Sequence, residues 1–445
     1  MRLPFFAMFT TTLLACGGTA TIPPTPEPPS QPTPQPLLLQ PQVTRFVHDC
    51  KTKPEAPGCD AAETLTRDRN AFALDLYQQL RSAPGNLVLS PFSVRDVLSM
   101  AYLGAAGETE KAFAKALHDN IGVAGVATAI HAEAKRVVVK NRRGEASYVL
   151  RLANRVWVDQ DAALTPDYVT AVGKAFGADP AWVDFRHEPE RSRDTINTWV
   201  NSETIGKVPG LMPPGSINAS TRVALTNAVY FEAGWASEFD ATLTKPLAFY
   251  LEGKPKVLVP TMSQVSKLGY AKVADAEVVH LNYDSGGARM VLIVPDSGGL
   301  EAFEAALTTL ALEAMIAPQP SVLLDLQLPK FATQHATTLK PALTAMGLGI
   351  AFSDRADFSE MAPDQLKVSA VFHEAFVSID EEGTEAVAAS GATLVPISGV
   401  LQMKPVKVRI NRPFMFVILS GKTGGILFMG RVLDPRGQPE LQSER

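Results

Sequence analysis

The sequence predicts an α+β fold, because helix-forming patterns gather in the first half of the folded region and strand-like apolar runs in the second, without regular alternation. The chain has 445 residues, of which 46% are hydrophobic, as expected for a globular protein. Its 41 Lys and Arg against 46 Asp and Glu give a net charge of −5. This balance lacks the basic footprint of a nucleic-acid-binding protein, so no nucleic-acid partner is expected.

The individual elements follow from spacing. Ala73, Leu76, Tyr77 and Leu80 recur at helical intervals, and a second helical stretch continues through Leu98 and Leu103. Apolar runs of strand length follow at 148–158, 223–231, 290–294, 322–328, 406–410 and 414–419. Because no repeat of fixed period accompanies them, a solenoid or propeller is not expected.

The first fifteen residues predict an export signal. Arg2 precedes an apolar stretch that ends at Ala15, which is shorter than the roughly 20 residues that span a bilayer. Leu13-Leu14-Ala15-Cys16 resembles the bacterial lipobox, in which cleavage before the cysteine is followed by lipidation of its thiol. The sequence therefore predicts anchoring to a membrane through Cys16, with an ordinary cleaved signal as the alternative.

Residues 16–65 are expected to separate this anchor from the folded domain. Ile22–Gln42 is rich in proline and predicts an extended spacer without a core. Once Cys16 is lipidated, Cys50 and Cys59 remain as an even pair that can close a small disulfide loop, or they remain as two free thiols. The expected location is the bacterial cell envelope, with Gly17 favouring the outer membrane or cell surface, or else the extracellular space. The folded domain is expected to cover 66–445.

No catalytic chemistry is predicted. Asp-Ser-Gly-Gly occurs at 284–287 and 296–299 without the preceding glycine of chymotrypsin-like proteases, and both copies flank a strand, where such residues form turns. The seven histidines form no zinc-binding pair, and no phosphate-binding glycine loop is present. The chain is thus expected to be neither an enzyme nor the holder of a metal or cofactor.

One segment of small residues follows the apolar strand 375–379. Read with the period of a strand, Thr384, Ala386, Ala388, Ser390 and Ala392 share one face. Small side chains at alternate positions suit a narrow slot between strands. A flexible linker or the start of a helix are the alternatives for the same residues.

Short motifs in a fixed order resemble those of the serpins, from about Asn70 to Pro435. In the first half they are Ser90-Pro91-x-Ser93, Leu103-Gly104-Ala105, Ile196-Asn197-x-Trp199, Thr204-x-Gly206-Lys207 and Leu225-Thr226-Asn227-Ala228-Val229-Tyr230-Phe231 with Trp235. In the second half they are Leu328-Pro329-Lys330-Phe331, Asp357-Phe358-Ser359, His373-Glu374-Ala375, Asn411-Arg412-Pro413-Phe414 and Phe428-Met429-Gly430-Arg431.

The resemblance implies one domain of three β-sheets and eight or nine helices, with an exposed reactive loop. It implies that a serine protease, or in some cases a cysteine protease, attacks this loop and is trapped as the acyl-enzyme when the loop inserts into the central sheet. The hinge of the loop would comprise Glu382, Gly383, Thr384, Glu385, Ala386, Val387, Ala388, Ala389 and Ser390. A non-inhibitory serpin, which acts as a binding protein or a protease substrate, is the alternative, and a monomer is expected in either case.

Counting along the family pattern from Gly383 places the cleaved bond at Ile397-Ser398. Counting back from Pro413 points instead near Gln402, so Leu401-Gln402 and Leu394-Val395 remain as alternatives. No Arg or Lys occurs between Thr384 and Met403, which predicts elastase-, chymotrypsin- or subtilisin-like targets rather than trypsin-like ones.

Other positions match structural sites of the family. Ser90, Ser93, Asn227 and His373 match the shutter, a polar cluster beneath the point where the central strands part, and Trp235 matches the breach where insertion begins. Five basic residues between Lys135 and Arg143 cluster near the end of a predicted helix; the resemblance implies a nearby basic surface that binds polyanions in some members, although a solvated helix end is the simpler interpretation.

Overall fold

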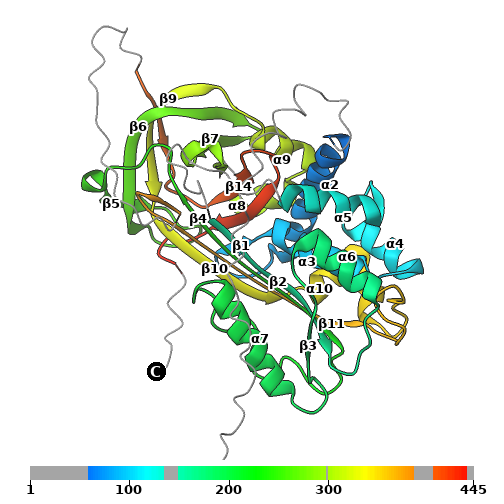
Figure 1. Cartoon of the computed structure of the whole chain (residues 1–445). Coiled ribbons are helices and arrows are strands. Elements are labelled where there is room, and N and C mark those ends of the chain that lie inside the picture. The colour runs from blue at the N-terminus through cyan, green and yellow to red at the C-terminus, as the bar shows by residue number, and fades with distance from the viewer. Residues whose placement is uncertain (1–58, 135–148, 297–298, 385–403, 438–445) are drawn as a thin grey trace, which may run out of the picture. The chain divides into compact units, whose positions relative to one another are not determined.

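The computed structural model describes residues 59–134, 149–296, 299–384 and 404–437, all within one compact unit that extends from Pro41 to Arg445. The described helices are α2 (Cys59–Leu80), α3 (Pro91–Tyr102), α4 (Gly107–Ala116), α5 (Gly122–Ala134), α6 (Pro166–Phe176), α7 (Pro189–Glu203), α8 (Leu300–Ala306), α9 (Thr309–Ile316) and α10 (Lys340–Leu343). These nine helices and the two sheets described below confirm the predicted α+β class (Figure 1).

Six of the strands form one sheet with the order β10-β11-β12-β4-β2-β3. Its strands are β2 (Val149–Asp159), β3 (Ala181–Val183), β4 (Val223–Gly234), β10 (Phe331–Thr338), β11 (Val368–Ile379) and β12 (Gly383–Thr384). Strands β4 and β11 pair in parallel from Val223 and Val368 to Tyr230 and Phe376. Beyond Phe376 they separate, and β12 lies between them.

The remaining strands form a nine-stranded sheet with the order β1-β15-β14-β8-β7-β6-β9-β13, to which β5 is attached through β6. They are β1 (Leu87–Leu89), β5 (Lys245–Phe249), β6 (Val257–Val273), β7 (Ala276–Asn282), β8 (Ala288–Pro295), β9 (Ser321–Pro329), β13 (Val406–Arg409), β14 (Phe414–Ser420) and β15 (Ile426–Val432). The family pattern implies three sheets. Hydrogen bonding joins two of them here, because the 17-residue strand β6 pairs with β5 and β9 along one part and with β7 along the other.

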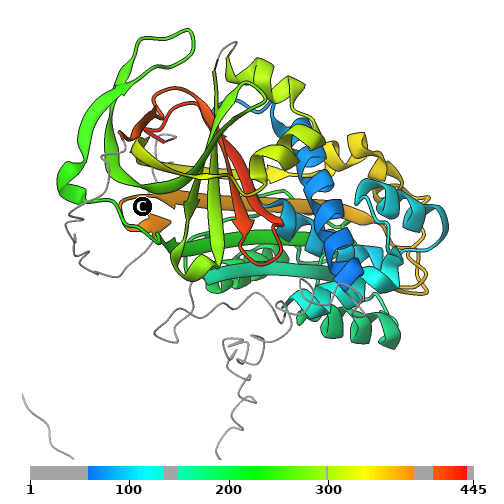
Figure 2. The same ribbon diagram turned by 90° about the horizontal axis from the view of Figure 1, so that it is seen from above.

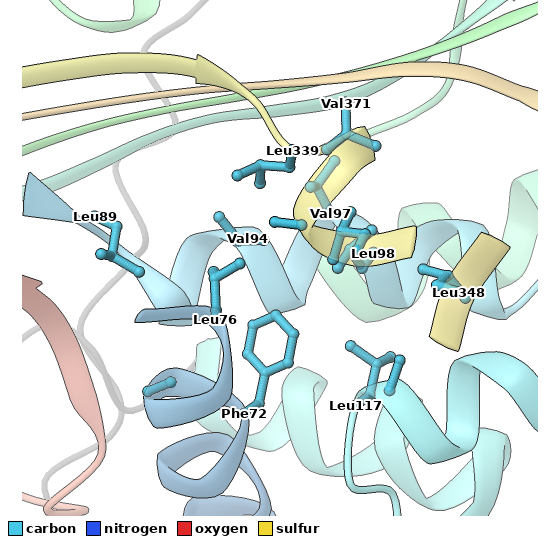
Figure 3. Packing of buried hydrophobic residues seen from close by; sticks show 14 of the residues in the cluster. Phe72, Leu76, Leu89, Val94, Val97, Leu98, Leu117, Leu339, Leu348 and Val371 are labelled. Carbon is cyan, nitrogen blue, oxygen red and sulfur yellow. The ribbon is translucent and has the colours of Figure 1, made fainter. Parts of the chain in front are cut away.

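Helix α3 lies in the interior of the domain and illustrates why the sequence folds as it does. The Ser90 hydroxyl accepts a hydrogen bond from the Ser93 backbone N–H as the N-cap, and Pro91 occupies the first turn, where its missing N–H costs nothing. All twelve residues of the helix are buried. Figure 3 shows where three apolar side chains of α3 pack: Val94, Val97 and Leu98 lie beside Phe72 and Leu76 of α2 and beside Val371 of β11. The helix therefore packs against one face of the six-stranded sheet.

Helix α7 covers the opposite face of the six-stranded sheet (Figure 1). Its Ile196 and Val200 belong to one apolar cluster with Ala224 and Ala228 of β4 and Phe372 of β11. The helix therefore lies across the line along which β4 and β11 pair, which we call the seam. In the view from above, the long strands β11 and β4 run side by side (Figure 2).

The six apolar runs predicted as strands all coincide with strands of the structure, namely β2, β4, β8, β9, β13 and β14. The two predicted helices correspond to α2 and α3, although α2 begins at Cys59, seven residues before the predicted boundary of the folded domain. The first Asp-Ser-Gly-Gly copy forms a turn at Asp284–Gly286 before β8, as predicted. Among the described helices, none has the length and apolar character needed to cross a membrane.

Candidate functional site

The candidate site lies at the upper end of the seam, where β12 occupies the space between β4 and β11. Thr384 pairs with Ile379 of β11 on one side and with Ala233 of β4 on the other, and Gly383 pairs with Gly234. Thr384 is fully buried. The first residues of the predicted hinge are therefore already part of the sheet, and they run antiparallel to both neighbours.

A tight turn directs the chain back into this space after β11. The Asp380 carboxylate accepts hydrogen bonds from the backbone N–H groups of Glu382 (3.0 Å) and Gly383 (3.1 Å), and the Asp380 N–H donates to the Gly383 carbonyl (2.9 Å). Glycine is required at 383, because a Cβ atom there would lie 2.1 Å from the carbonyl oxygen of Ala233. The sequence thus provides a reversal that only a glycine permits.

An aromatic cluster of Phe231, Trp235 and Tyr283 packs against the turn and bonds its backbone. Trp235 donates its indole N–H to the Asp380 carbonyl (2.9 Å) and its backbone N–H to the Glu382 carbonyl (2.8 Å). Tyr283 stacks on Trp235 with ring centroids 4.5 Å apart and contacts Phe231 edge to face. The Tyr283 hydroxyl lies 2.6 Å from the Thr384 hydroxyl, and both residues are fully buried.

An ion pair fixes the residue at the outside of the turn. The Glu381 carboxylate accepts hydrogen bonds from the Lys330 ammonium (2.6 Å) and from the Thr244 hydroxyl (2.7 Å). The Glu381 carbonyl accepts from the Phe239 N–H (2.9 Å). Three separate segments of the chain therefore converge on the turn that opens the predicted hinge.

Further down the seam, the predicted shutter residues form one buried network, which we call the polar cluster: Ser90, Ser93, Asn154, Asn227 and His373. The Asn227 amide donates to Ser93 and, over 2.6 Å, to the Asn154 carbonyl oxygen, while the Ser93 hydroxyl donates to the same oxygen (2.9 Å). The Ser90 hydroxyl donates to the Leu427 carbonyl of β15 (2.7 Å). The cluster thus ties α3 to both strands of the seam and to the second sheet.

His373 connects the two strands across the seam itself. Its Nε2 accepts from the Ser90 backbone N–H (3.3 Å), so the ring proton must reside on Nδ1, which donates to the Asn227 side-chain oxygen (2.5 Å). Burial lowers the pKa of His373 to about 3, because the charged form loses its hydration, and the neighbouring His335 acts in the same direction. His373 is therefore neutral at physiological pH, as this pair of bonds requires.

Replacing Asn227 with alanine should destabilise the domain by about 2–4 kcal/mol, because the His373 N–H loses its acceptor in a site closed to water and a cavity remains. Thermal unfolding of Asn227→Ala and of a control, Asn201→Ala, measures the effect. Asn201 lies on α7, and its side-chain oxygen has no hydrogen-bond partner among the described residues. Equal unfolding temperatures for the two variants would contradict the assigned role of the polar cluster.

The structure places Glu382, Gly383 and Thr384 with Trp235 at the upper end of the seam, and Ser90, Ser93, Asn227 and His373 in the polar cluster. Glu385–Ser390 of the hinge, the candidate bonds Ile397-Ser398, Leu401-Gln402 and Leu394-Val395, and Cys16 and Cys50 lie outside the described residues, as do Lys135–Arg143. Cys59 is the first residue of α2, so the predicted disulfide has only one described partner.

Several residues that the site uses were not singled out from the sequence, among them Asn154, Lys330, Glu381 and Tyr283. Asn154 was the easiest of these residues to predict from the sequence. It lies on a predicted strand, and a buried polar side chain in an apolar strand needs a hydrogen-bond partner. Lys330 belongs to the motif Leu328-Pro329-Lys330-Phe331, and its partner Glu381 precedes the predicted hinge by one residue. Tyr283 gave no signal, because it stands beside a turn and its contact partner lies 101 residues away.

Comparison with known proteins shows the family to which the chain belongs. The family model described as "Serpin (serine protease inhibitor)" matches residues 67–435. The leukocyte elastase inhibitor of Sus scrofa is 34% identical over 385 residues, covering 84% of this chain and all of that protein. The chain belongs to the serpin family.

Solved structures agree with this assignment at the level of the fold. Serpin48 of the insect Tenebrio molitor, described as a highly specific serpin, matches with a TM-score of 0.73 and 27% identity over 83% of this chain and 98% of its own. Human thyroxine-binding globulin, solved in complex with thyroxine, matches with a TM-score of 0.75 and 26% identity over 84% of this chain and 99% of its own. The same fold thus serves a highly specific serpin and a thyroxine-binding protein.

Proposed function

We propose that this protein is a suicide-type inhibitor of serine proteases, which traps the acyl-enzyme by inserting its reactive loop into the six-stranded sheet. The observation that carries the proposal is β12, in which Gly383 and Thr384 lie as a short strand between β4 and β11. The seam accommodates loop backbone at its upper end, with hydrogen bonds to both neighbours and a buried side chain. Gly383 and Thr384 therefore occupy the first positions of the strand that insertion would form.

The reaction with the protease follows ordinary acyl-transfer chemistry as far as the acyl-enzyme. The protease serine oxygen attacks the carbonyl carbon of Ile397, the bond to Ser398 breaks, and the new amine takes the proton that the serine lost. An ester then links Ile397 to the protease. Insertion of the residues after Thr384 between β4 and β11 would pull the tethered protease along the sheet and disturb the geometry that water needs to hydrolyse the ester.

The class of target follows from the loop composition. A trypsin-like pocket pairs a buried carboxylate with Arg or Lys, and neither occurs from Thr384 to Met403. Apolar pockets, as in elastase-, chymotrypsin- and subtilisin-like proteases, fit Ile397, Leu401 and Leu394. Several relatives at 33–34% identity are named leukocyte elastase inhibitors, which supports this class.

A denaturing gel tests the proposal. The full chain, solubilised in detergent, is incubated with elastase, chymotrypsin, subtilisin and trypsin, and the first three are expected to give a band at the summed mass that survives boiling. Mass spectrometry of the released C-terminal peptide, expected to begin at Ser398, identifies the cleaved bond. Loop cleavage without such a band would overturn the inhibitor assignment in favour of a binding role, and a stable complex with trypsin would overturn the target class.

We further propose that the inhibitor is located at the bacterial cell envelope and is tethered through lipidated Cys16, with the residues between Cys16 and α2 as the spacer. The gel described above, run on membrane and soluble fractions of cells that produce the full chain, checks this location. The complex-forming protein should be in the membrane fraction. A Cys16→Ser variant should be found in the soluble fraction instead. If the variant remained in the membrane fraction, this would contradict the lipid anchor.

A further inference from the structure

A cation–aromatic stack lies between α7 and the face of the six-stranded sheet that this helix covers. The guanidinium carbon of Arg155, on β2, lies 4.2 Å from the ring centre of Trp199 on α7 and 5.4 Å from that of Trp157 on β2. The two indole rings meet edge to face, with centroids 5.4 Å apart. Helix and sheet are therefore joined here by a charge and two rings, and not by apolar packing alone.

The register of the sheet directs Arg155 toward α7. Arg155 pairs with Thr226 of β4. Trp157 pairs with Ala224, which belongs to the apolar cluster under α7, so Arg155 and Trp157 share the face that the helix covers. The Trp157 indole N–H donates to the Thr226 hydroxyl (2.9 Å), which fixes the ring. The sheet side of the stack is thus held by β2 and β4.

Arg155 depends on the two rings, because its other surroundings satisfy the guanidinium only in part. Its Nε is buried and has no hydrogen-bond partner among the described residues. Burial lowers the pKa of Arg155, because the charge loses hydration, and the carboxylates of Glu203 and Asp179 act in the opposite direction. A partly desolvated guanidinium with an unpaired N–H gains most from an aromatic face.

The attachment of α7 differs on the two sides of the seam. On the β4 side it includes the stack, and the segment after α7 adds a second contact of the same kind, in which the Lys207 ammonium lies 5.6 Å from the ring centre of Tyr230. On the β11 side, Ile196 and Val200 share an apolar cluster with Phe372. The two cation–aromatic contacts thus both attach to β2 or β4, and neither crosses the seam.

We propose that Arg155 is a positioning residue that anchors α7 to β2, and that the strength of its stack with Trp199 sets how often α7 lifts from the seam. A strand that enters between β4 and β11 moves them from about 5 to about 10 Å apart. Since Ile196 and Val200 contact both strands, α7 cannot keep both contacts while the seam widens. The consequence for insertion rests on the proposed inhibitory function, whereas the anchoring of α7 does not.

Hydrogen exchange of the full-length protein tests the anchoring without any protease. Arg155→Met removes the charge and keeps the length of the side chain. Exchange of the peptide 189–203 should therefore accelerate by about two- to thirtyfold, while exchange of α3 stays at the wild-type rate. Arg155→Lys, which keeps a charge near the ring, should restore part of the protection.

The matched control for this experiment is Arg151→Met. It makes the same change on the same face of β2, at a side chain that has no aromatic ring contact among the described residues. Exchange of α7 in this variant should stay close to the wild-type rate. Equal acceleration in the two methionine variants, or none in Arg155→Met, would overturn the anchoring role.

A double-variant cycle shows whether the contact itself is responsible. Trp199→Leu removes the ring and keeps an apolar side chain. Exchange of α7 in Arg155→Met/Trp199→Leu should be slower than the product of the two single effects predicts. Should Trp199→Leu fail to fold, Trp199→Phe, which keeps a weaker ring, takes its place. Multiplicative effects would overturn the proposal, since the two side chains would then act separately.

Uptake of a peptide tests the consequence for the seam. The probe is a synthetic peptide with the sequence of residues 384–396, whose alternating small residues suit a strand between β4 and β11. Intact Arg155→Met should take up this peptide faster than wild type, by the factor seen in the exchange of α7, and Arg151→Met should take it up at the wild-type rate. Unchanged uptake in Arg155→Met despite faster exchange would overturn the control of the seam by α7.

The two proposals fail in different ways. If wild type traps protease but Arg155→Met shows unchanged exchange of α7 and unchanged peptide uptake, the role of Arg155 is wrong and the inhibitor assignment stands. If no protease is trapped and no peptide is taken up by any variant, the inhibitor assignment fails. Exchange of α7 alone then decides whether Arg155 anchors the helix, with unchanged exchange again overturning that role.

Discussion

Replacing Thr384 with arginine is expected to convert the protein from an inhibitor into a substrate. Thr384 has no exposed surface and lies against Tyr283 beneath the turn. A guanidinium at this position would have to leave water without a counter-ion, at a cost of several kcal/mol. Insertion of the cleaved loop should then slow by about two orders of magnitude or more, so hydrolysis of the acyl-enzyme overtakes trapping.

The measurement is the number of inhibitor molecules consumed for each protease molecule trapped. It should be near unity for the wild type and rise steeply for Thr384→Arg, while the rate of loop cleavage persists. Glu382→Arg is the matched control, since it introduces the same side chain two residues earlier at an exposed position of the turn. A Thr384→Arg protein that traps protease as efficiently as the Glu382→Arg control would show that position 384 does not enter the sheet during inhibition.

The sequence was most informative where a pattern repeats within a short stretch. The apolar runs at 148–158 and 223–231 coincide with β2 and β4, because strands whose residues are buried in succession, as the first nine residues of β4 are, leave a continuous apolar run in the sequence. The alternation of small residues after the strand 375–379 placed Thr384 on an inward face, and Thr384 is buried in β12. The remaining inward positions of that alternation lie outside the described residues.

The parts that sequence reasoning could not supply depend on contacts between distant residues. Tyr283 meets Thr384, and Asn154 meets Asn227, only after the strands have paired, so neither partner can be inferred from its own neighbours. The joining of two expected sheets also escaped prediction, because it depends on β6 continuing without interruption past its pairing with β9. Family resemblance identified the seam, whereas the structure supplied what holds its upper end.

Cleavage of the reactive loop is expected to stabilise the protein greatly, which is the second large effect. Once Ile397 and Ser398 are separated, the chain after Thr384 is free to continue β12 down the seam between β4 and β11. About a dozen added residues, each gaining a net hydrogen bond worth about 0.5–1.5 kcal/mol, give a total on the order of 10 kcal/mol. The intact molecule is then a metastable state that persists through a kinetic barrier.

The central claim is that the seam accepts the whole hinge segment as a new strand, and the thermal unfolding temperature of loop-cleaved protein tests it most directly. The chain is nicked by a protease that it does not trap, such as a metalloprotease, and compared with intact protein in the same buffer. The account predicts a rise of about 20 °C or more, from roughly 2 °C per kcal/mol in a domain of this size. An unfolding temperature unchanged by complete cleavage would contradict it, because the loop would then have remained outside the sheet.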